Sequence, residues 1–332
     1  MTCRKGHTGR CFCTPLWNRE TARMTCGAGA AVVYYNHRMQ NGVSSSFITA
    51  PDGLRLHARC YGNRTASATP VVCLPGLART AADFEALASA LSHEKPIRRV
   101  IALDYRGRGQ SQYDRNPANY ALPVELADVL AVVTALDVTP AIFVGTSRGG
   151  ILTMLLAAVR PTAIVGAVLN DIGPVIEPRG LMRIKSYVGK LPQPRSFEEG
   201  AEILRRLFSG QFPKLEMKDW LASAHRMFKE EKGRLVPTYD VKIATPMDGV
   251  EAERRVPPLW QQFDALRAKP LMVIRGANSD LLTGETVEAM RARRKAMDVI
   301  EVPDQGHAPL LTDAATIGRI AEFVHRCDRT IH

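Results

Sequence analysis

Ser147 stands between two glycines in the segment 144–150, which reads VGTSRGG. The preceding run AIFVG (141–145) is short, apolar and β-branched, as in a buried strand, and ILTMLLAAV (151–159) is typical of a helix. Ser147 is therefore predicted on a tight turn from strand to helix, where residues 145–149 fit the G-x-S-x-G pattern of a nucleophile elbow. A turn of this kind either exposes a nucleophile or merely closes a loop. We interpret Ser147 as a nucleophile, which needs a base within hydrogen-bond reach.

His307 is the histidine best placed to be that base. The segment PDQGHAPLL (303–311) directly follows the last predicted strand, so His307 is expected on a loop at the carboxyl end of a strand, at the same sheet edge as Ser147. The other seven histidines fall in the N-terminal segment, in predicted helices, in a hairpin strand, at a helix end or at the last residue. The alternative for His307 is an ordinary loop histidine.

A carboxylate must hold the tautomer of the base and stabilise the imidazolium. Asp280 follows the predicted strand at 270–276 and is our prediction for this role, with Asp171, on the loop after the preceding strand, as its rival. Asp304 is too close to His307 in the sequence and is expected to shape its own loop. The order serine, aspartate, histidine that results is that of the α/β-hydrolases.

Composition and charge narrow the class of protein. The chain has 332 residues and a formal net charge of +11, but six of its Lys and Arg residues lie within 1–43 against one acid, and the rest are interspersed with acids. This distribution does not predict a nucleic-acid site. No apolar run approaches the length of a membrane span, and the seven cysteines form no zinc-binding pattern and demand no oxidising compartment. We therefore expect a cytoplasmic protein.

From residue 45 onward, short strands alternate with helices of 10–15 residues. This alternation predicts an α/β fold with a mainly parallel, doubly wound sheet of about eight strands. Prolines and charged residues crowd into 173–259, where 197–208 and 218–228 resemble short amphipathic helices, and the alternation then returns. We predict a basic, disordered extension over 1–43, a core over 44–172 and 260–328, and a helical lid inserted at 173–259.

Three further segments accompany the serine, histidine and aspartate. LPGLART (74–80) follows one predicted strand, LDYRGRGQS (103–111) matches a D-x-R-G-x-G-x-S loop, and GHAPLL (306–311) surrounds His307. With these segments the chain from about 45 to 326 resembles the α/β-hydrolase superfamily. The resemblance implies an oxyanion hole made by the backbone N–H groups of Leu77 and Arg148.

The chain departs from the superfamily pattern at three positions, because Pro75 replaces the usual oxyanion-loop histidine and Thr146 and Arg148 replace residues common in the elbow. These departures leave the mechanism intact and the substrate open. The Arg148 side chain could bind a substrate carboxylate, or it could point away and contribute its backbone alone.

The hypothesis from sequence is a serine hydrolase that cleaves a carboxylic ester or lactone through an acyl-enzyme, with a small molecule as its partner and with no metal or organic cofactor. The segment 176–257 holds 16 Lys and Arg and 12 Asp and Glu, which favours soluble, moderate-sized substrates over lipid. The alternatives are hydrolysis of a carbon–carbon bond in a ring-fission product and a receptor that only binds its ligand. The sequence leaves the oligomeric state open.

Overall fold

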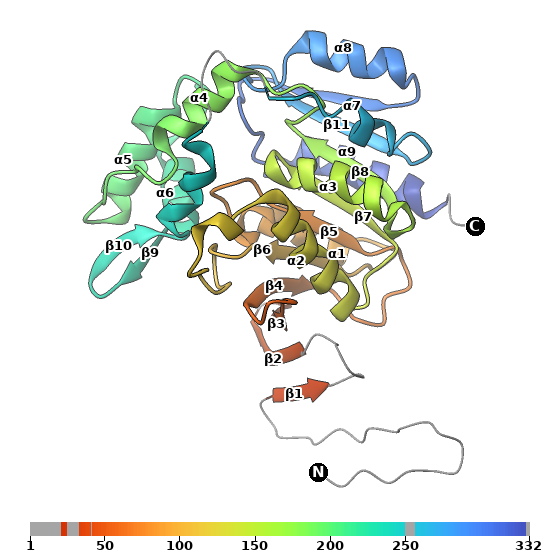
Figure 1. Cartoon of the computed structure of the whole chain (residues 1–332), viewed down its shortest axis with the longest axis horizontal. Coiled ribbons are helices and arrows are strands. Elements are labelled where there is room, and N and C mark those ends of the chain that lie inside the picture. The colour runs from red at the N-terminus through yellow and green to blue at the C-terminus, as the bar shows by residue number, and fades with distance from the viewer. Residues whose placement is uncertain (1–20, 25–32, 41, 250–255, 330–332) are drawn as a thin grey trace, which may run out of the picture.

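The structure is a computed structural model that describes residues 21–24, 33–40, 42–249 and 256–329. Its centre is a ten-stranded sheet in the order β1-β2-β3-β4-β6-β5-β7-β8-β11-β12 (Figure 1). The six strands from β6 to β12 run parallel, and the first four pair antiparallel. The predicted fold class, a mainly parallel sheet with eight strands from β3 to β12, is confirmed.

Short apolar runs become the strands that carry the site. β5, β6 and β7 are buried along nearly their whole length, as expected for parallel strands that helices cover on both faces. The strands of the sheet are β1 (Thr21–Met24), β2 (Val33–Gln40), β3 (Val43–Thr49), β4 (Arg55–Tyr61), β5 (Val71–Leu74), β6 (Val100–Asp104), β7 (Ala141–Thr146), β8 (Ile164–Asn170), β11 (Leu271–Gly276) and β12 (Asp298–Val302).

Helices cover both faces of the sheet. Apolar side chains of α1 and α9 pack in one core cluster, and those of α2, α3, α7 and α8 pack in the other. The helices of the core are α1 (Glu85–His93), α2 (Leu122–Ala135), α3 (Arg148–Val159), α7 (Trp260–Asp264), α8 (Gly284–Arg293) and α9 (Ala314–Asp328), with 3₁₀ turns η1 (Ala81–Phe84), η2 (Pro117–Asn119) and η3 (Pro161–Ala163). None of the helices in the described part of the chain combines the length and apolarity needed to cross a membrane.

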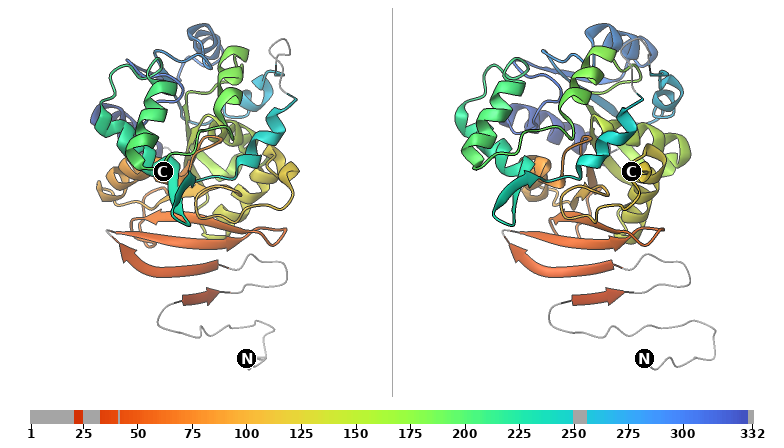
Figure 2. Two further views of the ribbon diagram at one scale, coloured as in Figure 1. Left: turned by 90° about the vertical axis from the view of Figure 1, so that its left-hand side faces the viewer. Right: turned by 60° about the vertical axis from the view of Figure 1, so that its left-hand side comes forward.

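The N-terminal prediction needs a correction. Residues 21–24 and 33–40 form β1 and β2, which extend the sheet antiparallel beyond β3 (Figure 2), so the expected disordered extension over 1–43 is wrong for these two segments. The physical reason is that β3 would otherwise present an unpaired row of backbone N–H and C=O groups. Residues 1–20 lie outside the described residues.

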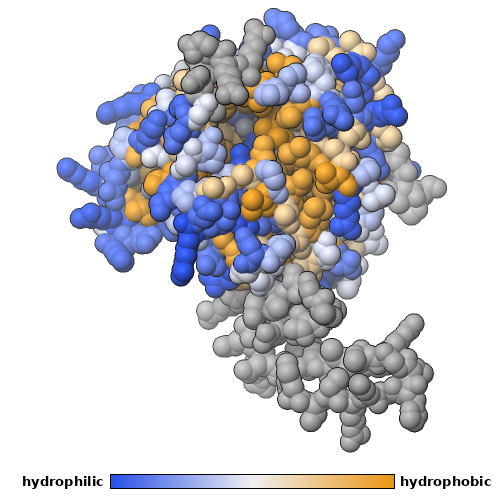
Figure 3. All heavy atoms as spheres, viewed as in Figure 1, coloured by the Kyte–Doolittle hydropathy of each residue, from blue (hydrophilic) through white to orange (hydrophobic). Residues whose placement is uncertain are grey.

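The elements between β8 and α7, from residue 178 to 247, form a separate layer over the carboxyl edge of the sheet. We call this layer the lid. Its predicted helices appear as α5 and α6, while the hairpin of β9 and β10 was not predicted. Hydrophilic side chains cover its outer face, at the left of Figure 3. The lid contains α4 (Pro178–Tyr187), α5 (Phe197–Phe208), α6 (Met217–Met227), β9 (Phe228–Glu231), β10 (Arg234–Pro237) and η4 (Val241–Met247).

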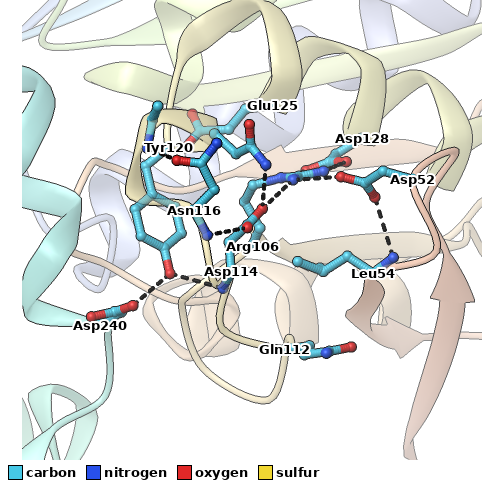
Figure 4. A network of polar contacts seen from close by, with 12 residues as sticks. Asp52, Leu54, Arg106, Gln112, Asp114, Asn116, Tyr120, Glu125, Asp128 and Asp240 are labelled. Carbon is cyan, nitrogen blue, oxygen red and sulfur yellow. Dashed lines mark hydrogen bonds and ion pairs between the residues drawn. The ribbon is translucent and has the colours of Figure 1, made fainter.

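The loop 103–111 contacts the lid through its backbone, since the Gly109 N–H donates to the Thr238 carbonyl oxygen at 2.7 Å. It contacts the core through the buried side chain of Arg106 (Figure 4). The Arg106 guanidinium is fully buried and donates to Asp128 on α2, at 2.6 Å, and to Asp52 in the β3–β4 turn, at 2.8 Å. Beside it, the Tyr120 hydroxyl donates to Asp240 at the base of the lid, at 2.6 Å. The D-x-R-G-x-G-x-S segment therefore acts as a structural connection between hairpin, α2 and lid.

Candidate active site

Ser147 occupies a strained turn between β7 and α3. Its φ of 51° and ψ of −112° lie where residues with a Cβ are uncommon. The flanking glycines make the turn possible, because a Cβ at Gly145 would lie 2.5 Å from the backbone of Gly149, and a Cβ at Gly149 would lie 2.0 Å from the Leu74 carbonyl oxygen. The G-x-S-x-G spacing is thus a requirement of the close approach between β5, β7 and α3.

His307 meets Ser147 as the sequence predicts. The Ser147 Oγ and His307 Nε2 atoms are 2.8 Å apart, although the residues are 160 positions apart in the chain. The backbone N–H of His307 donates to the side-chain oxygen of Gln211, in the lid, at 2.8 Å. The histidine loop is therefore held from the core side and from the lid side.

Asp171, and not Asp280, lies against His307. The distance from His307 Nδ1 to Asp171 Oδ2 is 2.8 Å, and the Asp171 side chain is fully buried. Its carboxylate also accepts the Gly276 N–H at 2.8 Å and the Ser279 hydroxyl at 2.5 Å. Because an ionised carboxylate only accepts, Nδ1 donates and Nε2 remains free to accept the proton of Ser147.

The prediction of Asp280 as the partner of His307 is therefore wrong. Asp280 forms a two-point ion pair with Arg183 of α4, at 2.6 and 2.8 Å. Burial alone would raise the pKa of Asp280, but the hydrogen bonds and charge of Arg183 lower it below its usual value. The sequence pattern failed here because β8 and β11 are parallel neighbours, so the loops after both strands reach the same edge of the sheet.

The two amides assigned to the oxyanion hole have no competing acceptor. In the described part of the chain, the N–H groups of Leu77 and Arg148 donate to no other residue, as is usual for the first N–H groups of a helix such as α3. Leu77 and Ser147 line the same cavity. This arrangement leaves both amides available to a negatively charged oxygen.

Of the two alternatives for the Arg148 side chain, the structure agrees with the one in which it points away, since Arg148 does not line the cavity. Its guanidinium donates to Glu125 at 2.5 Å and to the Tyr120 carbonyl oxygen at 3.1 Å. Glu125 is fully buried and also pairs with Arg108, at 2.9 Å. Arg108 in turn donates to the Leu77 carbonyl oxygen at 2.9 Å. Glu125 thus bridges the loop of Leu77 and the helix of Arg148, which carry the two free amides.

A second hydrogen-bonded row of serine, histidine and aspartate lies across the strands β3, β4 and β6. His57 Nδ1 lies 2.7 Å from Asp104, and His57 Nε2 lies 3.0 Å from the Ser45 hydroxyl. None of these residues lines the cavity at Ser147, and His57 is fully buried. We interpret this row as structural, because Asp104 also accepts the Ala81 and Gln110 N–H groups.

The cavity above Ser147 lies between the core and the lid. Most of its wall is apolar, with Ile184, Val188, Leu204, Phe208, Phe212 and Trp220 contributed by the lid. Three charged residues also line it, namely Arg79, Asp83 and Arg226. No motif in the sequence marks these three residues as a group. Their signal was weak, since Arg226 is far from the other two in the chain and only the lid brings them together.

Comparisons with known proteins agree with this architecture. The sequence profile of the Alpha/beta hydrolase family matches residues 71–319. The chain is similar to the 3-hydroxybutyrate-oligomer hydrolase of Cupriavidus necator (strain ATCC 17699 / DSM 428 / KCTC 22496 / NCIMB 10442 / H16 / Stanier 337), with 34% identity over 279 residues, 81% of this chain and 93% of that protein.

Solved structures show the same relationship. A crystal structure of an alpha/beta hydrolase from Novosphingobium aromaticivorans DSM 12444 is 37% identical, with a TM-score of 0.81 over 87% of this chain and 100% of that one. A putative hydrolase from Rickettsia typhi is 25% identical, with a TM-score of 0.76 over 87% of this chain and 99% of that one. The chain belongs to the alpha/beta hydrolase family.

Proposed function

We propose that this protein is a serine hydrolase of carboxylic esters, with Ser147 as nucleophile, His307 as general base and Asp171 as the residue that orients His307. The observation that carries the proposal is the unbroken row of hydrogen bonds from Ser147 through His307 to Asp171, each 2.8 Å long. The free amides of Leu77 and Arg148 beside the same serine support it, since an acyl transfer needs donors aimed at the developing oxyanion.

The proposed reaction has two halves. In the first, Ser147 Oγ attacks the ester carbonyl carbon while His307 Nε2 takes the hydroxyl proton, and the carbonyl oxygen becomes an oxyanion at the two amides. The tetrahedral intermediate expels the alcohol, which receives the proton from His307. In the second half, His307 takes a proton from water, the water oxygen attacks the acyl-enzyme, and the released Ser147 oxygen is reprotonated as the carboxylic acid leaves.

Short esters of hydroxy acids are the substrate class we propose. The Cupriavidus necator relative is named as a hydrolase of 3-hydroxybutyrate oligomers, and the match covers 93% of that relative. The hydrophilic outer face of the lid and the mostly apolar cavity favour a soluble substrate of a few units over a lipid surface (Figure 3). The proposed reaction needs no redox step, because ester hydrolysis exchanges only protons and acyl groups.

Hydrolysis of p-nitrophenyl acetate and butyrate by purified protein tests the proposal. Ser147→Ala should lose at least about 10³-fold in kcat, because the nucleophile is gone and only binding and the oxyanion donors remain. Ser186→Ala is the matched control, since Ser186 is an exposed lid serine whose hydroxyl donates only to the Arg183 carbonyl oxygen. It should keep full activity.

This assay, a measurement of ester binding and an assay with a β-diketone separate the alternatives. Turnover that survives in Ser147→Ala would contradict the proposed nucleophile. A folded protein that binds esters without turnover would favour the receptor, and cleavage of a β-diketone without cleavage of esters would favour the carbon–carbon hydrolase.

A further inference from the structure

Two guanidinium groups share one carboxylate inside the cavity. Asp83 accepts two hydrogen bonds from Arg79, both 2.8 Å long, and forms an ion pair with Arg226 of α6 at 3.4 Å. The three side chains keep 28%, 17% and 24% of their surface exposed, in the order Arg79, Asp83, Arg226. Two cations against one anion leave a surplus positive charge in a cavity whose other walls are mostly apolar.

Some guanidinium N–H groups of Arg79 and Arg226 have only weak hydrogen-bond acceptors. Arg79 gives its remaining terminal nitrogen, Nη1, to the Met227 sulfur at 3.1 Å, and a thioether is a weak acceptor. Arg226 gives Nη2 to the Ser223 hydroxyl at 3.1 Å. The other nearby acids have other partners, since Glu85 pairs with Arg59 and Asp219 accepts the Glu216 N–H. Arg79 and Arg226 can therefore bind a further anion.

The direction of the pKa shift of Arg226 agrees with a surplus of positive charge at this place. Burial and the like charge of Arg79 lower the pKa of Arg226, although Asp83, Glu85 and Asp219 act in the opposite direction. An anion from solution that binds here would relieve this repulsion. Attraction between the charges is strengthened by the apolar wall, because it lowers the local dielectric constant.

Arg79 lies close to the nucleophile, and Arg226 lines the same cavity. A Cβ at Gly76 would lie 3.3 Å from the Arg79 Cγ atom and 3.9 Å from the Ser147 Cβ atom, so both side chains flank the same glycine. Arg79 and Arg226 line the same cavity as Ser147 and His307. A small ester bound at Ser147 can thus place its far end at the guanidinium groups.

We propose that Arg79 and Arg226 form a carboxylate-binding subsite, so that the preferred substrates are esters that carry a free carboxylate. This inference rests on the proposed function for its chemistry and extends it, because it names a charge that the substrate must bear. A carboxylate here would accept from Arg79 and Arg226 while its ester carbonyl lies at Ser147.

Matched pairs of anionic and neutral esters test the subsite. Monoethyl succinate and ethyl pentanoate differ by a carboxylate on the acyl side, and 3-acetoxybutanoate and pentan-2-yl acetate differ by one on the alcohol side. The wild type should prefer the anionic member of at least one pair. Arg226→Gln should lower kcat/KM for that member by roughly 10- to 100-fold, mainly through KM, and by less than about threefold for its neutral partner.

Two further variants define the cause of the change. Arg226→Lys keeps the charge and should recover part of the preference, while Arg205→Gln removes an exposed lid arginine that pairs with Glu202 and should change neither pair. Equal losses for anionic and neutral esters in Arg226→Gln would overturn the subsite, as would a wild type that prefers the neutral esters.

Binding without turnover separates this inference from the proposed function. Monoethyl succinate is titrated calorimetrically into Ser147→Ala and into Ser147→Ala/Arg226→Gln. Binding that is at least tenfold weaker in the double variant supports the subsite even if no ester is hydrolysed by the wild type. Equal binding overturns the subsite even if Ser147 proves to be the nucleophile.

Discussion

At the scale of single residues, the proposed reactivity of Ser147 depends on two features from separate parts of the chain. The strained turn exposes its hydroxyl, and His307 receives the hydroxyl proton only if its Nδ1 atom donates elsewhere. Asp171 provides that acceptor, and its own carboxylate is fixed by the Gly276 N–H and the Ser279 hydroxyl. The tautomer of His307 is thus set by a residue that does not touch the serine.

This assignment distinguishes two aspartates experimentally. Asp171→Asn should lower kcat by roughly 10³-fold or more, because an amide can hold His307 in the wrong tautomer. Asp280→Asn removes only the ion pair with Arg183 and should change kcat by less than about fivefold. Steady-state kinetics on a p-nitrophenyl ester, with thermal unfolding to show that both variants are folded, give the comparison. The reverse ranking would return the role to Asp280.

At the scale of elements, distant segments are joined by a few buried ion pairs. The C-terminal helix α9 is joined to the segment before β6 by Asp328 and Arg98, whose closest atoms are 2.8 Å apart. Arg98 is fully buried and also donates to the Thr69 carbonyl oxygen. Burial would raise the pKa of Asp328, but the charge of Arg98 and the hydrogen bonds from Arg98 and Thr69 lower it below its usual value.

The sign of the resulting pH dependence follows from this lowered pKa. The ion pair stabilises the folded chain above the unfolded pKa and is lost as the pH falls through the lower folded pKa. At pH 7, Asp328→Asn should reduce the free energy of unfolding by roughly 1–3 kcal/mol. Urea unfolding from pH 7 downward should show this difference shrinking below about pH 4. A difference that stays constant to pH 3 would contradict the account.

Elements also show how far the sequence could predict the structure. The helix predicted over 197–208 is α5, because apolar residues at helical spacing and a capping serine, Ser196, mark it locally. β1 and β2 were missed because they gain their hydrogen bonds from β3 and from each other, and composition alone does not reveal such pairing. Ser147 and His307 were found because each follows a recognisable strand.

The remaining residues of the site could not be found in this way. Asp171 and Asp280 follow neighbouring parallel strands, so position at the sheet edge does not separate them, and only the side-chain partners do. The Arg148 side chain was a candidate for substrate binding until the structure placed buried Glu125 beside it. Arg226 could not be found from the sequence, because only the folded lid places it beside Asp83.

At the scale of the whole molecule, the sheet carries the proposed catalytic residues and the lid forms much of the cavity wall above them. Ser147, Asp171 and His307 all follow strands at one edge, while Arg226 and most of the apolar wall of the cavity come from the lid. Gln211 connects the two layers, because it accepts the N–H of His307. Changes in the lid should therefore alter substrate preference more than the reaction itself.

Covalent trapping with a fluorophosphonate tests the central claim most directly, because this reagent labels a serine only when it is activated as a nucleophile. Peptide mass spectrometry after labelling should place a single adduct on Ser147. The adduct should be lost in His307→Ala and retained in His57→Ala if that variant folds. An adduct on Ser45, in the second row, or the absence of any adduct on folded wild-type protein, would contradict the account.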